Sequence, residues 1–146
     1  MLCLTSFIPM LMGSAGNASS QTSVTIIRGL SLNEIRFSDL LRVIWKEIRV
    51  GVFCGIALAI ACFAKIMFVD CLLMQISGVN ALVAFTVSLT LLVAVVIAKI
   101  VGCSLPMLAQ KIGLDPAVMA SPFITSIVDA IALLAYFRLA SLLLPL

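Results

Sequence analysis

The chain has 146 residues, of which 64% are hydrophobic and 10% are charged, and nine Lys and Arg against six Asp and Glu give a net charge of +3. Soluble domains have about half apolar and about a quarter charged residues, so this composition excludes a water-soluble globule and indicates a bilayer protein. The sequence has no histidine, no C-x-x-C pair among its five cysteines and no aromatics interleaved with its basic residues, which argues against His-based catalysis, the common zinc sites, a disulfide framework and nucleic-acid binding.

The amino-terminal segment, residues 1–27, carries no charge but contains residues that interrupt a helical pattern, namely Pro9, Gly13, Gly16 and Asn17. The pattern predicts half a helix followed by an irregular Gly/Asn-rich loop. Such backbone is tolerated at membrane depth only where it is buried in protein or lines a wet cavity. The amide oxygens of Asn17 and Gln21 therefore make this segment a candidate site. A signal peptide is the alternative, and the lack of a basic region before the apolar stretch argues against it.

Residues 28–49 hold five of the nine basic residues. Ser31 to Glu34 fits a capping box, which predicts the start of a helix. The apolar residues that follow fall on one helical face, with charges on the other and an indole suited to the headgroup level: Leu40, Leu41, Ile44, Trp45 and Ile48. We expect a cytoplasmic interfacial helix that runs into the first membrane span.

Three runs are long and apolar enough to cross a bilayer as helices, which needs about 20 residues: 51–69, 79–98 and 116–137. The first carries a small-residue face at Gly51, Gly55 and Ala59 that favours helix packing. The second is expected to continue toward Gln110, with Pro106 as a kink and Gly113 as the stop. Asp115-Pro116 then reads as N-cap and first helical position of the third span.

Three crossings place residues 28–49 and 99–115 on one side of the membrane, with seven of the nine basic residues. The other side receives 65–78 and 138–146, with two. Because basic residues concentrate in cytoplasmic loops, the first side should be cytoplasmic and the carboxyl terminus should lie outside.

Asp129 is the most informative residue, because an acid within a spanning helix is costly unless it faces a cavity or a partner. Thr125 and Ser126 share its helical face, and Pro122 should leave a carbonyl oxygen of the preceding turn free. These hard oxygen donors suit Mg²⁺ or Ca²⁺ and indicate a cation pathway. The alternative is a structural ion pair between Asp129 and Lys99 or another buried base. No phosphate-binding loop, nucleophile elbow or hydrolase carboxylate pair occurs in the sequence, so we do not expect an enzyme.

Taken together, the chain resembles the membrane domain of the MgtE family of magnesium transporters and channels. The resemblance rests on four stretches in the order and spacing of that family: IPMLMGSAGNASSQ at 8–21, RVIWKEIRVGVFCG at 42–55, GLDPA at 113–117 and SPFITSIVD at 121–129. It covers nearly all of residues 1–146, as a partial transmembrane domain from the second half of the family's second helix through its fifth. The implied fold is an all-α integral membrane protein of the cell membrane.

The resemblance implies a homodimer with an ion pore on its two-fold axis, lined by the family's second and fifth helices. It implies that Mg²⁺ is the transported ion, with other divalent cations such as Mn²⁺ and Co²⁺ left open. The acid of the fifth helix, which binds hydrated Mg²⁺, corresponds to Asp129. The other pore-lining positions correspond to Gly13, Gly16, Asn17, Gln21, Pro122, Thr125 and Ser126.

The sequence departs from the family in two respects. Ala15 and Ser19 stand where glycine is usual, which is expected to narrow the pore or to change its backbone. The cytosolic Mg²⁺-sensing and CBS domains, the first membrane helix and the start of the second are absent, so we expect a fragment, a split gene product or a degenerate relative. A second polypeptide would then supply the missing parts. The contrasting hypothesis is a non-conducting membrane interaction module or an inactive relative.

Overall fold

The computed structural model describes residues 2–76, 78–119 and 122–144, with the side chains of residues 2, 3, 118 and 119 left aside. Within these ranges the chain forms helices and no strand, which confirms the predicted all-α fold. The long helices are α2 (Ile8–Ser31), α3 (Leu40–Lys65), α4 (Ala81–Lys111) and α5 (Pro122–Leu143). The short elements are helix α1 (Leu2–Thr5), the 3-10 turns η1 (Phe37–Asp39) and η3 (Pro116–Met119), and the π-helical turn η2 (Ile66–Leu73).

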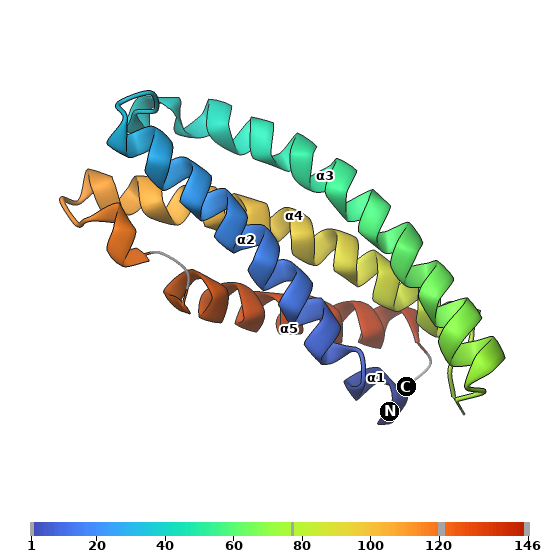
Figure 1. Ribbon diagram of the computed structural model, residues 1–146. Coiled ribbons are helices and arrows are strands. Elements are labelled where there is room, and N and C mark those ends of the chain that lie inside the picture. The colour runs from blue at the N-terminus through green and yellow to red at the C-terminus, as the bar shows by residue number, and fades with distance from the viewer. Residues whose placement is uncertain (1, 77, 120–121, 145–146) are drawn as a thin grey trace.

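The four long helices form an antiparallel bundle around α4 (Figure 1). Helices α2 and α4 run in one direction, and α3 and α5 run in the other. Helix α4 packs against the other three, and 56% of its most apolar stretch is buried, against 17% and 22% for the stretches that include α3 and α5. The turn after α2 and the turn after α4 therefore lie at the same end, where the Lys111 ammonium stands 4.3 Å from the centre of the Phe37 ring.

Three segments are long and apolar enough to cross a bilayer: Phe37–Leu73, Ala81–Lys111 and Pro122–Leu143. The first contains the predicted span 51–69, and the other two overlap the predicted spans 79–98 and 116–137 but begin later, at Ala81 and Pro122. The protein is a multi-pass membrane protein. Helix α2 lies beside them with 24 residues, a length of about 36 Å.

The predicted break in the amino-terminal segment is wrong, because α2 is one continuous helix through Gly13, Gly16 and Asn17. Pro9 lies in its first turn, where a missing N–H leaves no helical hydrogen bond unmade. The Ser19 hydroxyl donates to the Gly16 carbonyl at 2.9 Å, so this polar side chain is satisfied within the helix. Packing against α4 and α5 stabilises a helix whose glycines and serines have low intrinsic propensity.

The predicted capping box at Ser31 is also wrong. Ser31 is the last residue of α2, and the chain reverses through Asn33, whose φ is +57°. The 3-10 turn η1 leads directly into the next helix, and at its start the Arg36 N–H donates to Asp39 Oδ2 at 3.0 Å. Helix α3 then runs without interruption from Leu40, so the predicted interfacial segment and the first span are parts of one helix.

Helix α4 follows its prediction closely. Asn80 caps it by accepting the Val83 N–H at 2.9 Å, it continues through Pro106 to Lys111, and Gly113 follows with a φ of +80°. Only glycine adopts this backbone without strain, which ends the helix.

The start of the last span differs from its prediction. Asp115 accepts the Ala117 N–H at 2.9 Å and begins η3 rather than the spanning helix. The structure describes α5 from Pro122 onward, so this proline lies in the first turn of the described helix.

The centre of the bundle is built from small side chains. One buried cluster there joins α2, α4 and α5 through Ala15, Ala94, Ala98, Ile124, Val128 and Ala132. At one end the Tyr136 hydroxyl donates to the Leu4 carbonyl at 2.8 Å, which ties α5 to α1. Small residues allow the helix axes to approach closely, and this brings α2 against the polar stripe of α5.

Candidate functional site

The candidate site lies where α5 meets α2. A Cβ built on Gly16 would stand 3.6 Å from Asp129 Oδ1 and 3.6 Å from Thr125 Cγ2. The glycine therefore brings the α2 backbone directly against the acid. The structure thus brings together three of the predicted site residues, one from the second-helix motif and two from the stripe of α5.

Asp129 has a buried oxygen without a protein partner. Its side chain is half-buried, and Oδ1 accepts no hydrogen bond from the part of the chain that the structure describes. The hydroxyl oxygens of Ser23 and Ser88 share this condition, but Asp129 alone of the three can carry a formal charge. A carboxylate within a spanning helix is expensive to leave unpaired, which marks this position as a candidate ion site.

The two hydroxyls of the α5 stripe turn back onto their own helix. Thr125 donates to the Pro122 carbonyl at 3.0 Å, and Ser126 donates to the same oxygen at 2.8 Å. The Pro122 carbonyl oxygen therefore accepts hydrogen bonds from both hydroxyls of the stripe. Pro122 and Ser126 are exposed at the start of α5, one to two turns from the acid.

The remaining predicted residues lie apart from Asp129. Gly13 is exposed, and a Cβ built on it would meet no atom within 4 Å. Asn17 and Gln21 line a separate hollow of about 410 Å³ between α2, α3 and α4. The four α2 residues therefore divide between two faces, with Gly16 alone in contact with the stripe of α5.

The two departures from the family pattern point into the helix interface. Ala15 and Ser19 are fully buried, and Ala15 packs in the small-residue cluster. Ser19 lies against Gly102 of α4, where a Cβ would stand 2.6 Å from the Ser19 carbonyl oxygen. The predicted change of backbone is not observed, because α2 remains helical at both positions.

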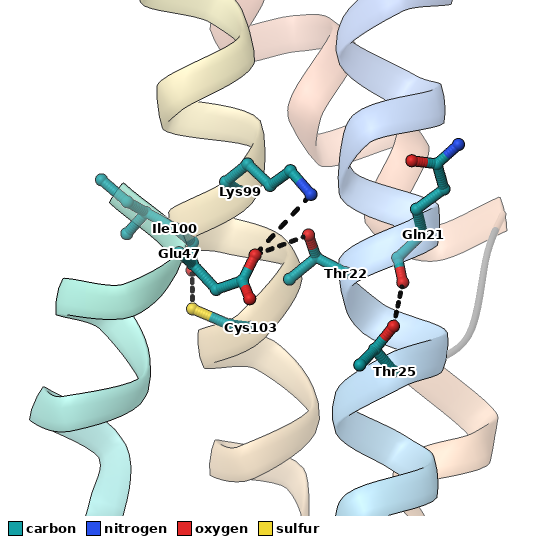
Figure 2. A network of polar contacts seen from close by, with 7 residues as sticks. All are labelled: Gln21, Thr22, Thr25, Glu47, Lys99, Ile100 and Cys103. Atoms are coloured by element: carbon teal, nitrogen blue, oxygen red, sulfur yellow. Dashed lines mark hydrogen bonds and ion pairs between the residues drawn. The ribbon is translucent and has the colours of Figure 1, made fainter. Parts of the chain in front are cut away.

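A second polar cluster, which the sequence analysis missed, joins three helices (Figure 2). The Thr22 hydroxyl of α2 donates to Glu47 Oε2 of α3 at 3.1 Å, and Lys99 Nζ of α4 lies 3.7 Å from the same oxygen. The Glu47 and Lys99 side chains are each 11% exposed. The predicted ion pair between Lys99 and Asp129 is therefore not formed, because Glu47 is the acid beside Lys99.

The sequence contains a signal that would have found Glu47. Val43, Glu47, Gly51 and Gly55 recur every fourth residue of α3 and are all buried. Such spacing defines one face of a helix, so an acid between an apolar residue and two packing glycines is an interior acid. The glycines do form the predicted packing face, since Cβ atoms built on Gly51 and Gly55 would lie 3.3 Å from the backbone of Val96 and Leu92 of α4.

Another ion pair lies at the carboxyl-terminal end of α3. The Lys65 ammonium donates to both carboxylate oxygens of Asp70, at 2.9 and 2.7 Å, and the Asp70 side chain is 6% exposed. The residues are five apart, a spacing that the π-helical turn brings together.

The described residues contain no group of three or more Cys, Asp or Glu side chains placed to hold a metal ion. One chain thus offers a single carboxylate at the α2–α5 contact. This donor set is too small for a dehydrated divalent ion and is compatible with an ion that keeps most of its water.

Comparison with known proteins agrees with this architecture. The family model MgtE, described as a divalent cation transporter, matches residues 8–139. Magnesium transporter MgtE of Bacillus subtilis (strain 168) is 32% identical over 140 residues, which cover 96% of this chain and 29% of the relative. The proteins of the same name from Thermus thermophilus and Enterococcus faecalis are each 32% identical, covering 94% and 93% of this chain and 29% and 28% of the relatives.

The match extends over nearly the whole chain, while the chain spans less than a third of the length of these relatives. The family model includes the helices that carry Gly16, Glu47, Lys99 and Asp129. The chain belongs to the MgtE family of divalent cation transporters.

Proposed function

We propose that this chain forms part of a pathway for Mg²⁺ across the membrane, with Asp129 as the residue that binds the ion. The observation that carries the proposal is the buried, unpartnered Oδ1 of Asp129 against Gly16. The curated relatives are named magnesium transporters, which supports transport rather than catalysis.

Electrostatics favours a divalent cation at this position. The negative charge of Asp129 has no basic partner among the described residues, since Lys99 is engaged by Glu47 and Lys65 by Asp70. An ion that enters a partly dehydrated environment needs such a charge to offset its lost hydration. Because Mg²⁺ sheds water reluctantly, we propose that Asp129 binds a largely hydrated ion through water.

The working unit is proposed to be a homodimer. Two Asp129 carboxylates facing each other across a two-fold axis would carry two negative charges, equal and opposite to the charge of the ion. Gly13, Asn17 and Gln21 are proposed to line the path elsewhere along α2, where all three are exposed and where Asn17 and Gln21 border their own hollow. A second polypeptide that supplies the remaining helices and cytosolic domains of the relatives is a further part of the proposal.

The proposed orientation places residues 28–49 and 99–115 in the cytoplasm. The turns after α2 and after α4 lie at the same end of the bundle, which supports a common side for these two segments (Figure 1). The excess of basic residues at that end supports the cytoplasmic side.

The test is Mg²⁺-dependent thermal stabilisation of the purified chain in detergent. At a Mg²⁺ concentration a hundredfold above Kd, binding stabilises the folded state by about 2.7 kcal/mol. At about 2–4 °C per kcal/mol for a chain of this size, Tm should rise by about 5–11 °C. Asp129→Asn keeps the shape and removes the charge, so its Tm should not respond to Mg²⁺.

Asp115→Asn is the matched control, because it neutralises an exposed acid outside the bundle and should retain the full response. Ion flux into vesicles that contain the chain provides the second measurement, with loss of Mg²⁺ entry expected for Asp129→Ala. A Mg²⁺ response that survives Asp129→Asn would show that Asp129 is not the ligand. Stabilisation without flux in the wild type would favour the non-conducting module.

A further inference from the structure

The buried cluster of Thr22, Glu47 and Lys99 lies outside the α2–α5 contact (Figure 2). One of its members, Thr22, belongs to α2, the helix that forms one side of that contact. We infer that Glu47 is a positioning residue, which through Thr22 holds α2 at the rotation that places Gly16 against Asp129. The inference rests on the proposed function, since it assigns a second-helix requirement to the same ion site.

Beside the proposed ion site, the packing of α2 is made by small side chains. Between Ala15 and Ser19 it contacts α4 and α5 through Ala15, Gly16 and Ser19, and Gly102 on α4, whereas its larger buried side chains, Leu11, Ile26 and Leu30, lie to either side of this stretch. Such surfaces set how closely two helices approach, but they lack the large side chains that interlock and fix one helix about its axis. A polar contact at a defined side chain adds a constraint on the rotation of this stretch.

The Thr22 hydroxyl is such a contact. It donates to a carboxylate oxygen that belongs to α3 and lies beside an ammonium of α4, so α2 is attached to both neighbours at one point. Hydrogen bonds to charged groups are stronger than those between neutral groups. Thr25, one turn further along α2, makes no comparable contact, since its hydroxyl donates to the Gln21 carbonyl of its own helix at 2.9 Å.

Because α2 is one continuous helix, a rotation at Thr22 also moves Gly16 at the proposed ion site. Gly16 precedes Thr22 by six residues, about 9 Å along the axis. Because Cα atoms lie about 2.3 Å from the axis, a rotation of about 20° moves the Gly16 Cα by about 0.8 Å. Binding sites tolerate displacements of about 0.5 Å, so loss of the Thr22 contact should weaken ion binding.

Lys99 makes the arrangement electrostatically neutral. With its charge opposite that of Glu47, the pair adds no net charge to the bundle interior and does not compete with Asp129 for a cation. The structure therefore separates two acids of the bundle by role: Glu47 has a basic neighbour and holds helices, and Asp129 has none and faces the proposed path.

The first test measures Mg²⁺ half-saturation by thermal stabilisation in Thr22→Val, Thr22→Ser and Thr25→Val. Valine keeps the shape of threonine and removes the hydroxyl. Thr22→Val should raise the half-saturating Mg²⁺ concentration about tenfold, the change that 1.4 kcal/mol produces. Thr22→Ser should restore the wild-type value, and Thr25→Val should leave it unchanged. A Thr22→Val protein with a lower Tm but wild-type half-saturation would overturn the inference and leave the contact a purely structural one.

The second test needs no ion. In a chain whose native cysteines are replaced by alanine, Gly16→Cys and Thr125→Cys should form a disulfide, because the Gly16 Cβ position lies 3.9 Å from Thr125 Cβ, within disulfide range. Adding Thr22→Val should slow its formation, whereas adding Thr25→Val should not. Equal rates would refute the positioning role even if Mg²⁺ binds. If the wild-type chain shows no Mg²⁺ response but Thr22→Val still slows cross-linking, the proposed function is refuted and the positioning of α2 by Thr22 is confirmed.

Discussion

Gly102→Ala should destabilise the protein although it introduces a better helix former. A Cβ at residue 102 would stand 2.6 Å from the Ser19 carbonyl oxygen, 3.0 Å from Ser19 Cα and 3.2 Å from its carbonyl carbon. All three atoms are backbone, so no side-chain rotation relieves the contact. Ordinary contact begins at 3.4 Å, and α2 and α4 must therefore move apart locally by several tenths of an ångström.

The magnitude follows from a comparison with Gly13→Ala. Both substitutions gain about 0.8–1 kcal/mol of helix propensity, because both glycines lie within helices. Only residue 102 meets another backbone, since residue 13 has no atom within 4 Å of its Cβ position. Overpacking costs about 1–3 kcal/mol, so this amount should separate the two variants. At about 2–4 °C per kcal/mol, the Tm of Gly102→Ala should lie about 2–12 °C below that of Gly13→Ala.

Thermal unfolding of both variants in the same detergent, followed by intrinsic fluorescence or circular dichroism, measures this difference directly. The comparison removes the propensity contribution and any general effect of the detergent. Equal Tm values for the two variants, or a higher Tm for Gly102→Ala, would refute the close approach of α2 and α4 at Ser19.

Three further predictions concern orientation and packing. Ser38→Cys, in a chain without native cysteines, should react with an impermeant thiol reagent only from the cytoplasmic side, and labelling from outside would reverse the orientation. Tyr136→Phe removes the hydrogen bond to the Leu4 carbonyl and should lower the free energy of unfolding by about 1 kcal/mol, measured by denaturation; an unchanged value would show that this contact adds nothing. Gly55→Asn should disrupt packing against Leu92 and reduce Tm without changing ion preference, and altered preference with intact packing would place α3 on the ion path.

The membrane spans were predictable because their signals are local. Length and apolar composition alone define a helix that can cross a bilayer, and Gly113 ends α4 through a backbone conformation that glycine adopts freely. The break predicted in α2 failed for the opposite reason. Glycine and serine lower helix propensity, but their small size is what lets α2 pack closely on α4, and this tertiary gain is not visible in a local pattern.

The candidate site, too, was predictable in part. Asp129 was predictable, since an acid in a spanning helix is rare and costly wherever it points. Its contact with Gly16 depends on the rotations of two helices far apart in sequence. The pairing of Lys99 with Glu47 rather than Asp129 depends on three helices at once, so the spacing along α3 identifies Glu47 as an interior acid but does not identify its partner.

The π-helical turn at the end of α3 is a place where the chain could lose one residue. Because η2 closes its hydrogen bonds over five residues, it holds one residue more than an α-helical turn that spans the same ends. Removing one residue between Lys65 and Asp70 would restore an i, i+4 spacing, at which the two charged side chains still meet. A single-residue deletion is therefore tolerable here, whereas the same deletion in the middle of α4 would rotate every later side chain away from its partner.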